Sequence, residues 1–188
     1  MEKFLIAGLG NPGARYAKTR HNAGADFVDE LSVKWGLKFE EKKSIKSYLA
    51  RYVFKNKDIY LIKPIVFMNN SGNSLKPAIK KYNLNLASVL IVHDDLDLPS
   101  GSCKLKKSGG DGGHNGLKSI NDYLGSNKYC RLRFGIGNNF KKGSQTDFVL
   151  EKWSDEELKS LPNLMDHNIN IIFHYIKHGS ENTMNKFN

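Results

Sequence analysis

The sequence predicts an α/β fold: a single domain, residues 1–188, with a twisted mixed central β-sheet flanked by α-helices. Strand-like and helix-like segments alternate along the chain, and no linker, internal repeat or low-complexity tract divides it. With 188 residues, 39% of them hydrophobic, the chain is long enough to bury one sizeable core.

Strands are predicted by short runs that are apolar or alternate between apolar and polar residues. These runs are residues 3–7, 48–55, 59–63, 89–92, 102–107 and 131–136. Residues 89–92 are wholly apolar, which is typical of a central strand covered on both faces. The second and third runs predict paired strands that turn at residues 56–58.

Helices are predicted where apolar residues recur with a helical period. Residues 27–35 carry such a stripe, which ends at Gly36, and residues 115–124 fit a helix that ends at Gly125. Residues 154–157 spell a capping box, a serine followed three residues later by a glutamate, which indicates another helix start.

Two prolines affect the predicted helix boundaries. Residues 71–83 look helical, but Pro77 argues against the middle of that helix, so we expect it to be short or to begin near Lys76. Near the C-terminus, we expect Pro162 to open a second helix, which stops at Gly179.

The composition excludes several classes of protein. No apolar run approaches the roughly 20 residues that span a membrane, and no apolar signal segment follows Met1, so we expect a cytoplasmic protein. The two cysteines, Cys103 and Cys130, form no C-x-x-C pair, which argues against a zinc ribbon or a disulfide framework. We expect two buried or half-buried thiols.

The charge balance indicates a polyanionic partner. Twenty-nine Lys and Arg residues against nineteen Asp and Glu residues give a formal net charge of +10. A basic surface attracts the phosphates of a nucleic acid, which raises both the affinity and the rate of association. Because many basic proteins bind nothing in particular, the charge alone is weak support.

The segment GLGNPG, residues 8–13, follows the first predicted strand and matches the spelling of a dinucleotide-binding loop. Its context contradicts that function, because Pro12 signals a turn and the helical stripe starts only about a dozen residues after the first glycine. Asp29 and Glu30 have roughly the spacing of a ribose-binding acid but fall within the helix. A nucleotide-dependent oxidoreductase is therefore disfavoured, and the glycines instead shape a loop that presents Asn11 and His21.

Four polar clusters follow predicted strands and could converge on one pocket at the carboxyl edge of the sheet. They are GLGNPGARYAKTRHNAG (8–24), FMNNSG (67–72), HDDLDLPSG (93–101) and GGDGGHNG (109–116). Taken singly, each has a plain structural explanation, such as a helix cap or a solvated turn. Four together favour a site.

The clusters favour general-base chemistry over metal or covalent catalysis. His93, Asp94, Asp95 and Asp97 could ligate a divalent ion, but neighbours on a strand point to opposite faces, and no recognised ligand cage is present. There is no G-x-S-x-G elbow, and neither cysteine has an obvious activating base. The remaining option is a histidine that activates water, oriented by a carboxylate and flanked by asparagine donors. Such a site suits an ester better than an amide.

These segments, together with RLRFGIG (131–137), resemble those of bacterial-type peptidyl-tRNA hydrolase, in that family's order and over residues 5 to about 137. The resemblance implies hydrolysis of the ester that joins a peptide to the terminal ribose of tRNA, which recycles tRNA from stalled or aborted translation. His21 would be the general base for water, and Asp94 would orient it. We expect a monomer that works without metal or cofactor.

The resemblance also implies the residues that bind substrate. Asn11, Asn69 and Asn115 match the family's substrate-positioning asparagines, and Met68 and His114 match residues that line its peptide channel and gate. Tyr16 is a further residue that we expect to bind the substrate or tRNA. The residues that match the family's tRNA phosphate contacts are Lys104, Lys106 and Arg133. Solvated charges at the sheet edge remain a reasonable interpretation of Arg131, Lys141 and Lys142. The alternative function is a non-catalytic RNA-binding module, against which His21 and Asp94 count.

Overall fold

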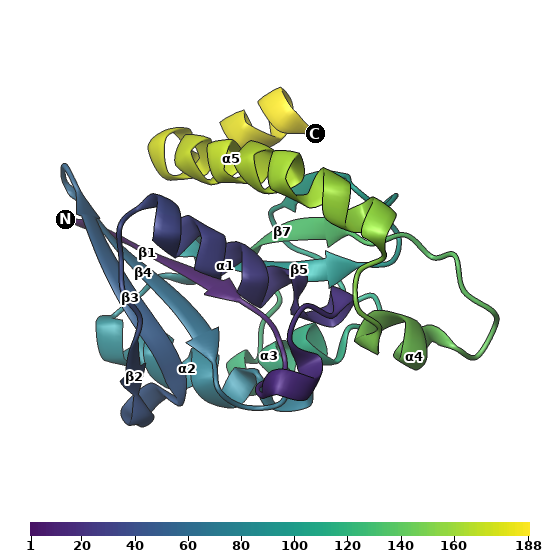
Figure 1. The fold of residues 1–188 in the computed structure, drawn as a ribbon. Coiled ribbons are helices and arrows are strands. Elements are labelled where there is room, and N and C mark those ends of the chain that lie inside the picture. Colours follow the sequence, from purple (N-terminus) through teal and green to yellow (C-terminus); the bar gives the residue numbers. More distant parts are fainter.

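The computed structural model describes all 188 residues and contains one seven-stranded sheet in the order β2-β3-β4-β1-β5-β7-β6. The strands are β1 (Glu2–Gly8), β2 (Glu40–Lys42), β3 (Ser47–Phe54), β4 (Lys57–Pro64), β5 (Val89–Asp95), β6 (Cys103–Lys106) and β7 (Cys130–Gly135). The helices are α1 (Ala23–Lys34), α2 (Gly72–Tyr82), α3 (Asn115–Leu124), α4 (Gln145–Leu150) and α5 (Asp155–Phe187). Figure 1 shows this α/β arrangement, and the predicted fold class is confirmed.

The sheet is mixed, with a parallel centre. Strand β1 pairs in parallel with β4 and β5, and β5 pairs in parallel with β7, while β2, β3 and β6 run antiparallel to their neighbours. The predicted central strand β5 is buried over Val89–Asp94. Strand β2, whose sequence is Glu-Glu-Lys, was not predicted, because a charged edge strand has no apolar alternation.

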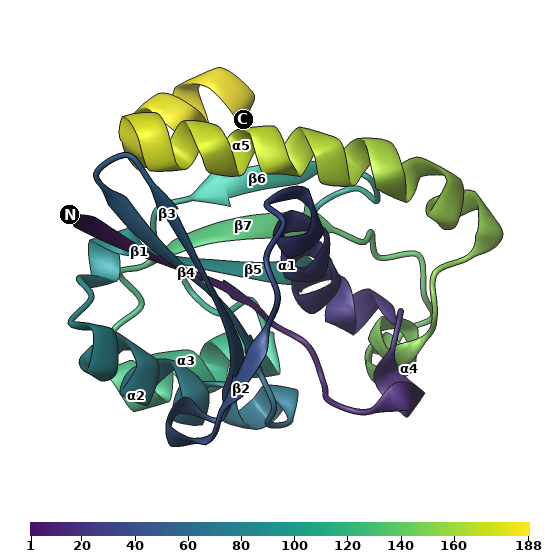
Figure 2. The same cartoon turned by 60° about the vertical axis from the view of Figure 1, so that its left-hand side comes forward.

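Helices cover both faces of the sheet. Figures 1 and 2 show α1 and α5 on one face and α2 and α3 on the other. The alternation of β1 divides its side chains between two cores: Ile6 packs with Phe27 of α1, whereas Leu5 and Ala7 pack with the cluster that includes Leu117 of α3. The parallel strands β1, β4, β5 and β7 end at a common edge, where the loops after β1 and β4 carry two of the polar clusters.

Glycines 8 and 24 let α1 lie unusually close to the sheet. A Cβ atom on Gly8 would come within 2.2 Å of the carbonyl oxygen of Gly24, and one on Gly24 within 2.1 Å of the carbonyl oxygen of Val92. The first glycine of GLGNPG thus serves helix packing, and α1 begins only at Ala23, well beyond the loop. The loop then extends along the carboxyl edge of the sheet toward His21.

The expectation about Pro77 was wrong. Helix α2 runs uninterrupted from Gly72 to Tyr82 with Pro77 inside it. The proline deprives only the carbonyl of Asn73 of its helical partner, and both residues are partly exposed, so water can replace that bond. Leu75 and Ala78 remain buried and hold the helix against the sheet.

The expectation that Pro162 opens a second helix was also wrong, whereas the capping box is confirmed. Ser154 Oγ accepts the backbone N–H of Glu157, and the Glu157 carboxylate accepts that of Ser154, so α5 begins at Asp155 and continues through Pro162. Gly179, with φ 80°, interrupts the helix before its last turns. Those turns bring Asn188 to β6, where its side chain bonds the backbone N–H and C=O of Leu105.

Two smaller expectations can also be compared with the structure. Cys103 and Cys130 are both free and buried, as predicted. None of the helices combines the length and the apolar character that crossing a bilayer requires.

Candidate active site

A cleft of about 640 Å³ lies at the carboxyl edge of the parallel strands. Its walls come from the loop after β1, the turn after β4, the end of β5, the glycine-rich loop before α3, and α4. Of the eleven predicted site residues, ten line this cleft; they are Asn11, Tyr16, His21, Met68, Asn69, Asp94, Lys106, His114, Asn115 and Arg133. Lys104 does not line the cleft.

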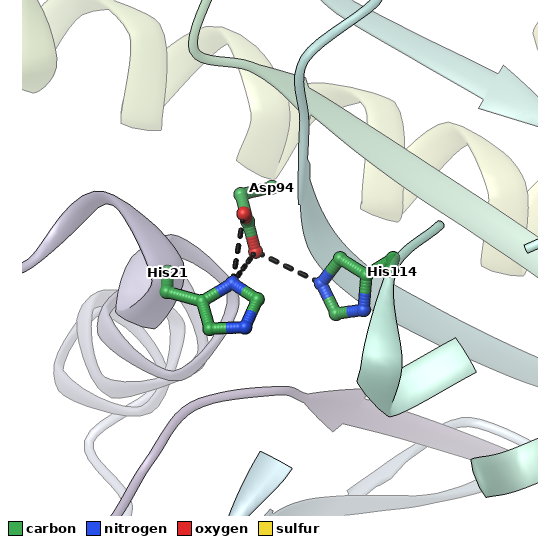
Figure 3. Close-up of side chains that lie close together, drawn as sticks. All are labelled: His21, Asp94 and His114. Carbon is green, nitrogen blue, oxygen red and sulfur yellow. Dashed lines mark hydrogen bonds and ion pairs between the residues drawn. The ribbon is translucent and has the colours of Figure 1, made fainter. Parts of the chain in front are cut away.

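Asp94 lies between two imidazoles on the cleft wall (Figure 3). The Nδ1 atom of His21 is 3.0 and 2.9 Å from the two carboxylate oxygens, and the Nε2 atom of His114 is 2.9 Å from Oδ1. Asp94 is 3% exposed, and the two rings are 4.9 Å apart between centroids. The predicted pairing of His21 with Asp94 is present, and His114 is a second partner of the same carboxylate.

Hydrogen bonds determine where the protons lie on both rings. His21 donates Nδ1–H to Asp94, which leaves Nε2 as the unprotonated nitrogen. His114 caps α3: its Nδ1 atom accepts the backbone N–H groups of Gly116 and Leu117, so its proton resides on Nε2 and is donated to Asp94.

The same bonds disfavour a metal ion among these residues. His21, Asp94 and His114 offer three ligand atoms within 4.8 Å of one another. A metal needs an unprotonated nitrogen, yet the nitrogen of His114 that faces Asp94 is the one that must carry the proton. The donor set therefore fits a shared carboxylate better than a cation site.

The electrostatics of the site make His21 a stronger base and keep Asp94 ionised. Burial alone lowers the pKa of His21, but the charge and hydrogen bonds of Asp94 outweigh burial, and the pKa is raised above its ordinary value. Burial raises the pKa of Asp94, but the charges of His21 and His114 outweigh it, so the pKa is lowered and the carboxylate stays ionised. Burial, with the charge of His114, lowers the pKa of the neighbouring His93 to about 3.

Three asparagines line the same cleft as His21: Asn11, Asn69 and Asn115. The side-chain oxygen of Asn11 accepts the backbone N–H of Met68 at 2.8 Å, so its NH₂ group is the end available to a ligand. The backbone of Asn11 is paired in turn with the side chain of Asn22, at 2.8 and 3.0 Å. Asn69 and Asn115 are exposed.

Apolar groups form another part of the wall. Met68 is buried beneath the turn after β4, whereas Phe67 is 55% exposed. Tyr16 meets Phe67 edge to face, with 6.1 Å between ring centroids. The sequence indicated Tyr16 and Met68 but not Phe67, whose exposure only the turn conformation decides.

The predicted phosphate-binding residues differ in their environments: Lys104 and Lys106 are exposed, whereas Arg133 is paired with a carboxylate. Lys104 and Lys106 alternate outward on β6 and are exposed, as their spacing predicted. Arg133 donates Nε–H to the Asp95 carboxylate at 2.6 Å, and this bond lowers the pKa of Asp95 against the effect of burial. Arg133 is therefore partly neutralised within the cleft.

The interpretation of Arg131 as a solvated charge was wrong. Arg131 is 2% exposed and donates to the carbonyl oxygens of Gly109 and Gly110, so it holds the glycine-rich loop that carries His114. The reason is that β7 lies inside the sheet between β5 and β6, and the loop covers its side chain. Lys141 and Lys142 are exposed, as expected.

The sequence also missed α4, which supplies Gln145, Thr146, Val149 and Leu150 to the cleft. The apolar run Phe148–Leu150 is short and lacks a helical stripe, so it carried little signal. Arg20, whose side chain ties α4 and α5 to the turn bearing His21, was likewise not singled out.

The chain is similar to known proteins over nearly its whole length. The family model described as peptidyl-tRNA hydrolase matches residues 5–188. The peptidyl-tRNA hydrolase of Porphyromonas gingivalis is 44% identical over 186 residues, which are 99% of this chain and 100% of that protein. That of Borrelia turicatae is 48% identical over 164 residues, which are 87% of this chain and 85% of that protein.

A solved structure extends the similarity to three dimensions. The crystal structure of peptidyl-tRNA hydrolase from Acinetobacter baumannii matches with a TM-score of 0.92 and 37% sequence identity, covering 98% of this chain and 94% of that one. Both the sequence and the fold therefore match over nearly the whole length. The chain belongs to the peptidyl-tRNA hydrolase family.

Proposed function

We propose that the protein hydrolyses the ester bond between a peptide, or an N-acyl-amino acid, and the 3'-terminal ribose of tRNA, and thereby releases tRNA for reuse in translation. The observation that carries the proposal is the His21–Asp94 pair, whose free Nε2 atom belongs to a ring in a cleft lined by three asparagines. Family membership supports the same reaction.

The proposed reaction starts at His21. Its Nε2 atom takes a proton from water, and the resulting hydroxide attacks the ester carbonyl, while Asp94 stabilises the imidazolium. The carbonyl oxygen becomes an oxyanion, which amide donors of Asn11, Asn69 and Asn115 stabilise. When the C–O bond breaks, the ribose oxygen leaves with the proton from His21, so the enzyme returns to its starting state.

The remaining predicted site residues bind the substrate or support the His21–Asp94 pair in this proposal. Tyr16 and Met68 contact the peptide, and His114 orients Asp94 from the side opposite His21. Lys104, Lys106 and Arg133 contact tRNA phosphates, which carry no base identity and suit an enzyme that accepts many tRNAs. We propose that it works as a monomer in the cytoplasm, without metal or cofactor.

The test is release of N-acetyl-amino acid from N-acetyl-aminoacyl-tRNA by the purified protein, with and without a chelator. We expect equal release under both conditions. No release by the wild-type protein would refute the hydrolase and favour an RNA-binding module, whereas loss of activity in the chelator alone would indicate a metal site.

A separate variant tests the role of His21 as the general base. His21→Ala should lower turnover by roughly 10²–10⁴-fold or more, because it removes the proposed proton acceptor, and the unprotonated nitrogen of the neighbouring His114 already accepts two backbone N–H groups. Binding of tRNA, measured by filter retention or fluorescence anisotropy, should change little. A comparable loss of binding would mean that His21 holds the substrate instead of activating water.

A further inference from the structure

The turn that carries His21 is anchored by the residue before it. Thr19, Arg20, His21 and Asn22 are all buried, although none of them belongs to a long helix or to the sheet. Such a segment takes its position from specific hydrogen bonds, and the side chain of Arg20 makes more of them than any other side chain in the segment.

Arg20 bonds three different parts of the C-terminal region. Its Nε and Nη2 atoms donate to the two carboxylate oxygens of Glu157 at 3.0 and 2.9 Å, which is the bidentate geometry. Its Nη1 atom donates to the carbonyl oxygen of Phe148 and to the carboxylate of Glu151, both at 3.2 Å. The guanidinium also lies 4.4 Å from the ring centroid of Phe148.

The partner carboxylate is itself held rigidly. Glu157 is the third residue of α5 and accepts the backbone N–H of Ser154 at 2.7 Å in the capping box. The backbone N–H of Arg20 also donates to the carbonyl of Glu151 at 3.0 Å. The chain before His21 is therefore tied to the start of α5 and the end of α4.

On these contacts we propose that Arg20 is a positioning residue for catalysis: through Glu157 it holds the His21 turn so that Nδ1 meets both oxygens of Asp94. The inference rests on the proposed hydrolase function. It also predicts that the C-terminal helix, far away in sequence, takes part in placing the base. Arg20 contacts no substrate in this account and acts through His21 alone.

The test compares Arg20→Met and Glu157→Gln with the wild-type protein in steady-state hydrolysis and in an NMR titration of the His21 imidazole. Arg20→Met should lower kcat roughly ten- to 100-fold, because a small misplacement of a catalytic group has effects of that size, and should leave KM within about threefold. Glu157→Gln should have a smaller effect in the same direction, since a neutral acceptor remains.

The titration separates positioning from mere stability. The titratable groups that face His21 are Asp94 and His114, and Asp94 is the one that raises the pKa of His21. A looser contact with Asp94 should therefore lower the pKa of His21 in both variants. A matched control is Arg51→Met, which breaks the bidentate pair with Asp58 between β3 and β4, outside the cleft. It should lower Tm but leave kcat and the His21 titration unchanged.

Several outcomes would overturn the inference. One is a folded Arg20→Met protein with wild-type kcat and an unchanged His21 titration; another is a rise of KM alone, which would limit Arg20 to shaping the cleft wall. If Arg20→Met does not fold, unchanged kcat and titration in Glu157→Gln decide against it. A wild-type protein without turnover would instead refute the hydrolase, and the NMR comparison would still decide the role of Arg20.

Discussion

Asp94 accepts hydrogen bonds from two histidines, and this arrangement favours an ionised carboxylate at the position. His21 and His114 both donate an N–H to the carboxylate, which is buried. A carboxylate accepts both bonds, whereas an amide of the same shape offers one acceptor and one donor. The arrangement explains why burial fails to neutralise this group.

A prediction at the residue scale follows for Asp94→Asn. Hydrolysis requires neutral His21, so the rate falls as the pH drops through the pKa of His21, which Asp94 raises above its ordinary value. Without that charge, burial is left to lower the pKa, and the acidic limb of the kcat profile should move to lower pH. The maximal kcat should also fall by roughly 10²–10⁴-fold, because His21 loses its oriented tautomer. An acidic limb that stays in place would show that another group sets it.

Residue-scale prediction from sequence succeeded where a side chain lies in a short, characteristic motif. Asp94 lies at the end of β5, and His21, Asn11 and Asn69 lie in the loops that follow β1 and β4, so these parallel strands bring them to one edge. Arg131 failed because its charge suggested solvent, while its burial depends on the loop that folds over β7. The second hydrogen bond to Asp94, from His114, could not be predicted, because it depends on the distance between two segments in the folded chain and not on a local sequence pattern.

At the scale of elements, helix α2 shows why proline misled the boundary prediction. Its apolar face, with Leu75 and Ala78 buried, holds it against the sheet, and this packing outweighs the one hydrogen bond that Pro77 removes. Helix α5 likewise continues through Pro162. That proline removes the helical hydrogen-bond partner of the carbonyl of Leu158, which is an exposed residue. Helix interruption occurs instead at Gly179, where the backbone has a positive φ.

We therefore expect Pro77→Ala to stabilise the protein. The new N–H can donate to the carbonyl of Asn73, and the gain is only about 1 kcal/mol, because proline also restricts the unfolded chain. In a protein of this size that corresponds to a rise in Tm of roughly 2–4 °C, measured by thermal unfolding. Lys76→Ala, at an exposed neighbouring position, is the control and should change Tm little. A lower Tm for Pro77→Ala would mean that contacts of the proline ring matter more than the missing bond.

At the scale of the whole molecule, the formal net charge is +10, and four of its cations lie in or beside the cleft. Lys106, Arg131 and Arg133 line the cleft, and Lys104 lies exposed beside Lys106 on β6. Two of these four charges are already engaged, Arg131 by loop carbonyls and Arg133 by Asp95. The two lysines are thus the cations most available to phosphates.

The corresponding prediction concerns salt dependence. Lys104→Ala combined with Lys106→Ala should weaken tRNA binding and reduce the slope of log K against log salt by roughly 1.4–1.8, if each lysine neutralises one phosphate. The matched control is Lys80→Ala with Lys81→Ala, which removes the same charge at the far end of α2. Equal slopes for the two double variants would argue against phosphate contacts at β6.

The sequence by itself determined the alternation of strands and helices, the central strand, the capping box and the motifs that identify the family, because each depends on residues close together in the chain. Only the tertiary structure decided the burial of Arg131, the continuity of α2 and α5, and the position of α4 in the cleft wall. It also decided that Asp94 meets two histidines and that Arg20 reaches Glu157, which lies 137 residues further along. These features depend on packing and hydrogen bonds between segments far apart in the chain, so local propensity and periodicity do not encode them.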